Sequence, residues 1–117
     1  MKIYQGEPIG FKINVKNDDG GYLPSLEGMS FEALLTNGTQ KGTRSFSTED
    51  GSIELGVETT ATGEKGYASF GLTGSDTAEL CPGNYTFEIA KVLEGGRAIG
   101  IEHGLVGILE AKIKKGI

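Results

Sequence analysis

The chain has 117 residues, 37% of them hydrophobic, which suits one domain with a packed core rather than a disordered chain. Its 16 acidic and 11 basic residues give a net charge of -5, which argues against a nucleic-acid partner. Neither a membrane-spanning apolar run nor a signal-peptide pattern is found, and the one cysteine excludes an internal disulfide. The 20 glycines follow no period and indicate turns between many short elements.

Alternation of apolar and polar residues predicts about eight short strands separated by turn-forming residues. The alternating positions are, in chain order, Phe11, Ile13 and Val15; Met29, Phe31, Ala33 and Leu35; Ile53, Leu55 and Val57; Ala68, Phe70 and Leu72; and Tyr85, Phe87 and Ile89. A return strand is expected over residues 43–47. Turns are predicted at NDDGG (17–21), at Asn37-Gly38 as a tight hairpin, at Glu49-Asp50-Gly51, at TGEKG (62–66) and at Gly95-Gly96.

Two stretches depart from this alternation. Between Leu72 and Tyr85, Asp76 and Glu79 are spaced to cap a single helical turn that Pro82 would end. Near the C-terminus a long apolar stretch, residues 99–113, is broken by Gly104 and Gly107. These glycines indicate either a bulge in one strand or two strands in tandem.

The segment LCPGNY, residues 80–85, places a tyrosine at the start of a predicted strand, directly after a Pro-Gly pair. It resembles the tyrosine corner of immunoglobulin-like and fibronectin-like sandwiches, in which the ring is buried and the hydroxyl bonds to upstream backbone. We therefore expect an all-β fold, a single immunoglobulin-like β-sandwich of about seven to nine antiparallel strands, spanning residues 1–117. Phe11, Val15, Phe31, Leu35, Phe70, Phe87 and Ile89 are expected to line one core.

Catalytic chemistry has little support in the sequence. Cys81 would need an activating base, and the chain's one histidine, His103, lies in a glycine-flanked strand segment. We expect Cys81 to be a semi-buried packing residue and His103 to be exposed or on an edge strand. NDDG and EDG lack the ligand spacing of a calcium loop, and GGRAIG (95–100) lacks the helix of a dinucleotide loop. No enzyme, catalytic residue, cofactor or metal site is expected.

Several short segments, taken in order, carry a family resemblance. They are Gln5, Gly6 and Glu7 before the first long strand, the Asp19-Gly20 turn, Leu26-Glu27-Gly28 before FEALL, GYASFGLT, Thr73 and Thr77 in the crossover, PGNYTFEI, a glycine hairpin, and GILEAKI. Together they resemble the N-terminal immunoglobulin-like domain of phage baseplate upper proteins and related tail-associated sandwich modules. The chain ends soon after the last predicted strand, and an accessory subunit is therefore expected rather than a full receptor-binding device.

This resemblance implies a non-enzymatic structural or assembly protein of a phage or prophage tail, which acts through protein–protein contacts. Other phage structural proteins or further copies of the chain are the expected partners, with neither nucleic acid nor membrane among them. The expected location is the cytoplasm after synthesis and the virion for a phage protein. The alternative is a carbohydrate-binding or adhesion module of a secreted protein, which an exposed aromatic platform would favour.

The candidate interface lies in the C-terminal strand region. Leu105, Val106, Ile108 and Leu109 would place apolar side chains on both faces of a strand near a sheet edge. Because a small sandwich has one interior, one of these faces is expected to need cover from a loop or a partner.

Overall fold

The computed structural model describes residues 1–17 and 19–111. These residues form eight strands and one short helix. In chain order the elements are β1 (Lys2–Tyr4), β2 (Ile9–Asn14), β3 (Ser30–Thr36), β4 (Thr43–Ser47), β5 (Glu54–Thr60), β6 (Gly63–Leu72), α1 (Gly74–Ala78), β7 (Gly83–Val92) and β8 (Ala98–Leu109). The predicted all-β class is confirmed, and the predicted return strand over residues 43–47 coincides with β4.

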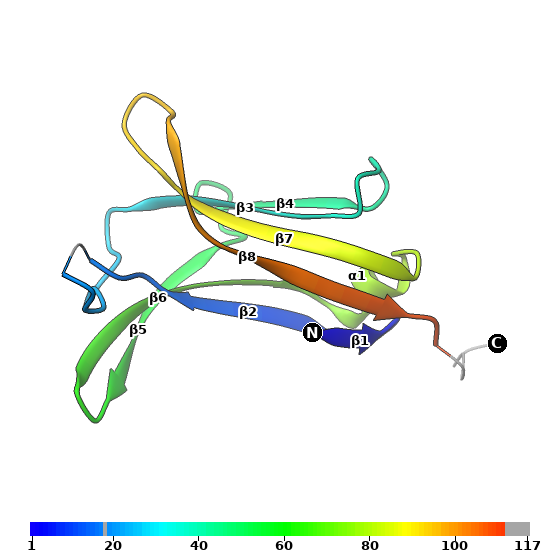
Figure 1. The fold of residues 1–117 in the computed structure, drawn as a ribbon, viewed down its shortest axis with the longest axis horizontal. Coiled ribbons are helices and arrows are strands. Elements are labelled where there is room, and N and C mark those ends of the chain that lie inside the picture. Colours follow the sequence, from blue (N-terminus) through cyan, green and yellow to red (C-terminus); the bar gives the residue numbers. More distant parts are fainter. Residues whose placement is uncertain (18, 112–117) are drawn as a thin grey trace.

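The strands form two sheets that pack face to face (Figure 1). The five-stranded sheet has the order β1-β8-β7-β3-β4, and the three-stranded sheet has the order β2-β6-β5. This division of consecutive strands between two sheets is the arrangement of immunoglobulin-like sandwiches. Neighbouring strands are antiparallel except β1, which pairs in parallel with the end of β8. The expectation of antiparallel strands is therefore wrong for β1.

The core lies between the sheets and is built from the predicted alternating positions. Phe11, Val15, Phe31, Leu35, Phe70 and Ile89 are buried, and Phe87 is partly buried against them. Four phenylalanine rings connect the layers in a chain of contacts from Phe87 through Phe11 and Phe70 to Phe46. The predicted shared core is thus confirmed.

Tyr85 forms the predicted corner at the start of β7. Its side chain is fully buried, and its hydroxyl donates a hydrogen bond of 2.8 Å to the Cys81 carbonyl. The side-chain amide of Asn37 approaches the same hydroxyl at 3.4 Å. Burial raises the pKa of the Tyr85 hydroxyl, and the neighbouring Cys81 adds to this effect. The corner tyrosine therefore locks the segment before β7 onto the core.

The helical turn before Pro82 is also present, with a different cap. Thr73 is the N-cap of α1 and forms a capping box with Asp76. The Asp76 backbone N–H donates a 3.2 Å hydrogen bond to the Thr73 hydroxyl. Glu79 lies at the C-terminal end of the helix. The prediction of the helix is confirmed, and the prediction that Asp76 and Glu79 make the capping pair is wrong.

Hydrogen bonds join α1 to the segment that follows β1. The hydroxyl of Thr77, which is fully buried, accepts from the Gly6 backbone N–H at 3.1 Å and donates to the Glu7 carbonyl at 2.7 Å. The Gln5 side chain donates to the Leu80 carbonyl at 2.8 Å. These bonds bring together residues from two of the segments on which the family resemblance rests, and they give these residues a structural role.

Two predicted turns differ from the structure. The β3–β4 connection spans residues 37–42 instead of a two-residue turn, because the Asn37 side chain accepts bonds from the backbone and hydroxyl of Thr39 and holds a wider loop. The β5–β6 turn is at Ala61 and Thr62, so it shares only Thr62 with the predicted TGEKG, because Gly63 takes the positive φ angle and already pairs with Thr60.

Gly104 and Gly107 do not mark the irregularity of β8. The register with β7 shifts between Ile89 and Ala90, so that Ile101 is the extra residue on β8. The alternative of a bulge within one strand is confirmed in kind, but the bulge is not at Gly104 or Gly107. Of the predicted stretch to residue 113, residues 112–113 lie outside the described residues.

Candidate interaction surface

The C-terminal half of β8 separates the four candidate interface residues into two groups. Val106 and Ile108 point into the core and are 1% and 2% exposed, whereas Leu105 and Leu109 are 70% and 39% exposed. The interior of the sandwich covers one face of the strand. Val106 and Ile108 are therefore core residues and not interface residues, which corrects the expectation for these two positions.

Two further exposed apolar residues, one in β1 and one just before it, lie along the same strand pair. Tyr4 pairs with Leu109 across the parallel strands and is 47% exposed. Met1 is 63% exposed. Its carbonyl accepts a 2.8 Å hydrogen bond from the Gly107 N–H, and its amino group donates one of 3.4 Å to the Leu105 carbonyl. We call Met1, Tyr4, Leu105 and Leu109 the β1–β8 apolar surface. Met1 and Tyr4 were missed in the sequence, where the alternation around Ile3 is too short to signal a strand.

Beyond the reach of β1, the edge of β8 is open. The β1 pairing covers residues 107–109 of β8, and within the described part of the chain no strand pairs with residues 98–104 on the side away from β7. An open strand edge presents unpaired backbone N–H and C=O groups. The end of β2 lies near this edge, across from residues 99–102 of β8.

A groove of about 780 Å³ lies beside this open edge, between β8 and the segment that follows β2. We call it the open-end groove. Its apolar lining residues are Val15, Tyr22, Leu23, Met29, Leu93, Ile99 and Ile101, and its charged ones are Lys16, Lys91 and Glu102. Ile99 and Tyr22 are 47% and 40% exposed, which places them at the rim.

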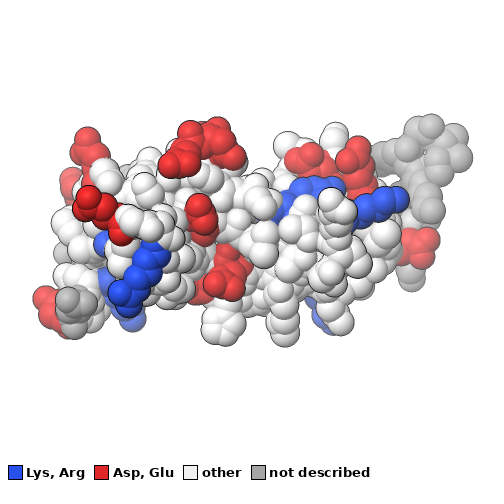
Figure 2. Space-filling view, turned by 90° about the horizontal axis from the view of Figure 1, so that it is seen from above, with Lys and Arg blue, Asp and Glu red and all other residues white. Residues whose placement is uncertain are grey.

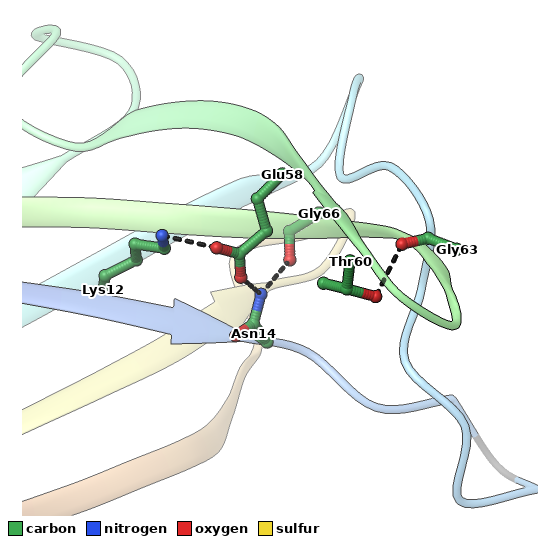
Figure 3. Close-up of polar contacts among 6 residues, drawn as sticks. All are labelled: Lys12, Asn14, Glu58, Thr60, Gly63 and Gly66. Carbon is green, nitrogen blue, oxygen red and sulfur yellow. Dashed lines mark hydrogen bonds and ion pairs between the residues drawn. The ribbon is translucent and has the colours of Figure 1, made fainter.

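The outer face of the three-stranded sheet carries a polar cluster (Figure 3). Lys12 Nζ lies 2.5 Å from Glu58 Oε2, and the Asn14 side-chain amide donates to Glu58 Oε1 and to the Gly66 carbonyl, both at 3.0 Å. These bonds tie β2 to β5 and β6. They lower the pKa of Glu58, mainly through Lys12, and the bond to Glu58 raises the pKa of Lys12. Since the groups satisfy one another, the cluster braces the sheet.

The tyrosines beside this cluster do not form a bare aromatic platform. Lys12 Nζ lies 4.9 Å from the ring centre of Tyr67, and Tyr67 leans over Gly56, where a side chain would collide with the ring. Lys16 and Lys65 lie over the ring of Tyr22 at 5.5 and 4.3 Å. Such cation–π contacts occupy the ring faces on which a sugar would stack.

Cys81 and His103, the residues that could pair as a thiol and its base, lie apart from one another. Cys81 is exposed, so its predicted semi-buried packing role is wrong, and His103 is exposed on β8 as expected. His103 pairs with Glu88, whereas Cys81 precedes Gly83, which pairs with Ile108. The register thus places them at different levels of the sheet. Among the described residues, no group of three His, Cys, Asp or Glu side chains is arranged to hold a metal ion.

The charges on the molecule are unevenly placed. Seen from the side of the five-stranded sheet, acidic side chains are spread along the face, whereas basic ones gather mainly in two groups toward the ends of the long axis (Figure 2). Acidic side chains and uncharged surface lie between these groups (Figure 2).

Comparison with known proteins gives no family assignment. No protein-family model matches the chain, and no curated protein matches it significantly. Among the residues that the structure describes, there is also no helix of sufficient length and hydropathy to cross a bilayer.

Proposed function

We propose that the protein is a non-enzymatic assembly subunit of a phage or prophage tail, which acts through protein–protein contacts of the β1–β8 apolar surface. The observation that carries this proposal is the exposure of Leu105 and Leu109 on a strand whose other face is already buried. Tyr4 pairs with Leu109 and adds an exposed ring, and Met1 is exposed just before β1, while Lys2 lies beside Gly107 between the two leucines. Exposed apolar residues grouped along one strand pair are typical of an interaction site, whereas single exposed apolar residues need no explanation.

The tail setting rests on the family resemblance together with the fold. The segments QGE, GYASFGLT and PGNYTFEI fall at the β1–β2 connection, on β6 and at the tyrosine corner. Each has a structural place in a sandwich of immunoglobulin-like order. The partner is a tail protein or a second copy of the chain, and the virion is the corresponding location.

Light scattering of the purified protein over a concentration series tests this proposal. We expect concentration-dependent association that Leu105→Lys and Leu109→Lys reduce, because a lysine places a charge within the contact. Leu34→Lys is the matched control, since Leu34 is 39% exposed on another strand of the same sheet. A protein that stays monomeric at millimolar concentration, with all variants alike, would contradict self-association.

A tail partner is tested separately by co-purification with the products of neighbouring genes. Retention of a tail protein by the unmodified chain and its loss in Leu105→Lys would support the proposal. Retention by both proteins would place the contact elsewhere. The alternative of a carbohydrate-binding or adhesion module is less favoured because lysines cover the rings of Tyr22 and Tyr67, and specific binding on a glycan array would reverse this preference.

A further inference from the structure

The open edge of β8 and the open-end groove lie side by side and offer complementary contacts. The β8 edge over residues 98–104 offers backbone hydrogen-bonding groups, which select an extended chain. β1 already uses the next part of the same edge, at Gly107 to Leu109, as a strand added in parallel. A further strand placed in line with β1 would continue this pairing toward Ala98.

The groove offers apolar contacts to the side chains of such a strand. Leu23, Met29 and Ile101 are partly buried, pack against the core cluster and also line the groove, so they form an apolar floor that remains accessible. Because side chains of a strand alternate between its two sides, every second residue of an added strand would point into the groove. Apolar residues at alternate positions therefore match this surface.

The charge of the groove differs in sign from that of the whole chain. Lys16 and Lys91 line it with one acidic residue, Glu102, and Lys65 lies next to it over Tyr22. The chain as a whole carries a net charge of -5. A locally basic rim on an acidic protein favours a partner segment with carboxylates, and it repels basic segments of the same shape.

We propose that the open-end groove is a docking site for an extended acidic segment of a partner protein, which adds to the β8 edge as a strand and places alternate apolar side chains in the groove. The site is distinct from the β1–β8 apolar surface and does not depend on a phage origin. Backbone bonds to β8 hold the segment, the groove selects its apolar residues, and Lys16 and Lys91 select its acidic ones.

A display library of random heptapeptides, selected on the full chain, tests this proposal. Selection against Ile99→Ser removes peptides that bind elsewhere, since Ile99 is a rim residue whose replacement leaves the core intact. We expect the enriched peptides to have apolar residues at alternate positions and an excess of Asp and Glu. Enrichment of basic or proline-rich sequences, or no enrichment over the Ile99→Ser variant, would overturn the proposal.

The most enriched peptide is then synthesised with a fluorophore and measured by fluorescence anisotropy. We expect Ile99→Ser to weaken binding about fivefold or more, and Lys91→Glu about two- to fivefold, with the charge effect reduced by salt. Leu34→Ser and Lys41→Glu are the matched controls, because both residues are exposed and absent from the groove lining, and both should leave binding unchanged. N-methylation of alternate peptide amides should abolish binding if backbone pairing holds the segment.

Equal binding of the N-methylated peptide would overturn the strand-addition geometry. An Ile99→Ser-sensitive dimer of the protein, found by sedimentation in the absence of any peptide, would make a second copy the occupant and would also overturn the proposal. The N-methylation result does not bear on the Leu105 and Leu109 experiment. A dimer through the groove differs from the proposed self-association because it responds to Ile99→Ser and not to Leu105→Lys, so this proposal and the proposed function fail separately.

Discussion

The rings of Phe11 on β2 and Phe87 on β7 meet across the two sheets with their centres 4.5 Å apart. In antibody domains a disulfide joins the corresponding strands, and its second cysteine lies two residues after the corner tyrosine, where this chain has Phe87. An aromatic contact therefore stands at the place of the covalent link. Each buried phenylalanine contributes about 1.5 to 3 kcal/mol through the removal of apolar area from water.

Gly104 gives Phe87 the room for this contact, and its replacement should destabilise the fold. A Cβ at Gly104 would lie 2.5 Å from the Phe87 ring, whereas a Cβ at Gly100 on the same strand would meet nothing within 4 Å. We expect Gly104→Ala to lower the free energy of unfolding by about 1 to 3 kcal/mol and Gly100→Ala to change it by less than about 0.5 kcal/mol. Urea denaturation measures both, and equal effects would contradict the role of Gly104.

Removal of the Tyr85 hydroxyl should weaken the corner. Tyr85→Phe leaves the Cys81 carbonyl without its 2.8 Å hydrogen bond, and we expect a loss of about 1 to 2 kcal/mol in the free energy of unfolding. Tyr4→Phe is the matched control, because that side chain is 47% exposed. Thermal and urea unfolding compare the two variants. An unchanged stability of Tyr85→Phe would mean that the hydroxyl bond makes no net contribution.

A lysine should destabilise the protein strongly on the inner face of β8 and hardly at all on its outer face. Val106→Lys places an ammonium group at a position that is 1% exposed, and we expect a loss of about 3 kcal/mol or more, or failure to fold. Leu105→Lys, one residue earlier at 70% exposure, should change stability by less than about 0.5 kcal/mol. Circular dichroism during urea titration distinguishes the two. Comparable stability of both variants would show that the register of β8 is shifted by one residue.

Part of the folding stability should be lost at acid pH, because the capping box of α1 needs an ionised Asp76. Bonds from the backbone and hydroxyl of Thr73 lower the pKa of Asp76 below its usual value of 3.8. A lowered folded-state pKa gives stability that is present above pH 4 or so and is lost as the pH falls through the folded-state pKa. We therefore expect the Tm difference between the unmodified protein and Asp76→Asn to be largest near pH 6 and to shrink toward pH 2. Glu27→Gln serves as an exposed control, and a difference that is constant with pH would contradict this origin.

Cys81 should be accessible to thiol reagents in the folded protein, since its side chain is exposed. We expect labelling by a chromogenic disulfide reagent at neutral pH within about tenfold of the rate for the urea-unfolded chain, because accessibility limits such reactions when no other group intervenes. Cys81→Ser should abolish the signal without loss of fold. Protection by several orders of magnitude would place the thiol inside the structure.

The alternating segments were predictable because each has one buried face. β3 and β4 follow the apolar pattern of Phe31, Leu35 and Phe46 closely, and a shift of one residue would have exposed these side chains. The tyrosine corner was predictable for a similar reason, since a buried tyrosine after Pro-Gly needs a backbone partner. These features depend on local sequence and on one core.

Features that depend on neighbours in space were not predictable. Val57 continues the apolar alternation of β5 but is 48% exposed, in a hairpin that Figure 1 shows extending past the other sheet. Gly104 of β8 makes room for the Phe87 ring, which only the packed strands reveal. The exposure of Cys81 and the open-end groove likewise depend on how the segments next to the strands are placed in space.

The parallel pairing of β1 with β8 has a mechanical consequence. Two parallel strands whose opposite ends are pulled apart slide along each other, so a load between the start of β1 and the end of β8 acts in shear. The bonds from Gly107 to the Met1 carbonyl and from Gln5 to the Leu109 carbonyl would then bear the force together, whereas the antiparallel β5–β6 hairpin, pulled at its two ends, would unzip one bond after another. The shortest strand of the sandwich is thus the one placed to resist tension along the chain.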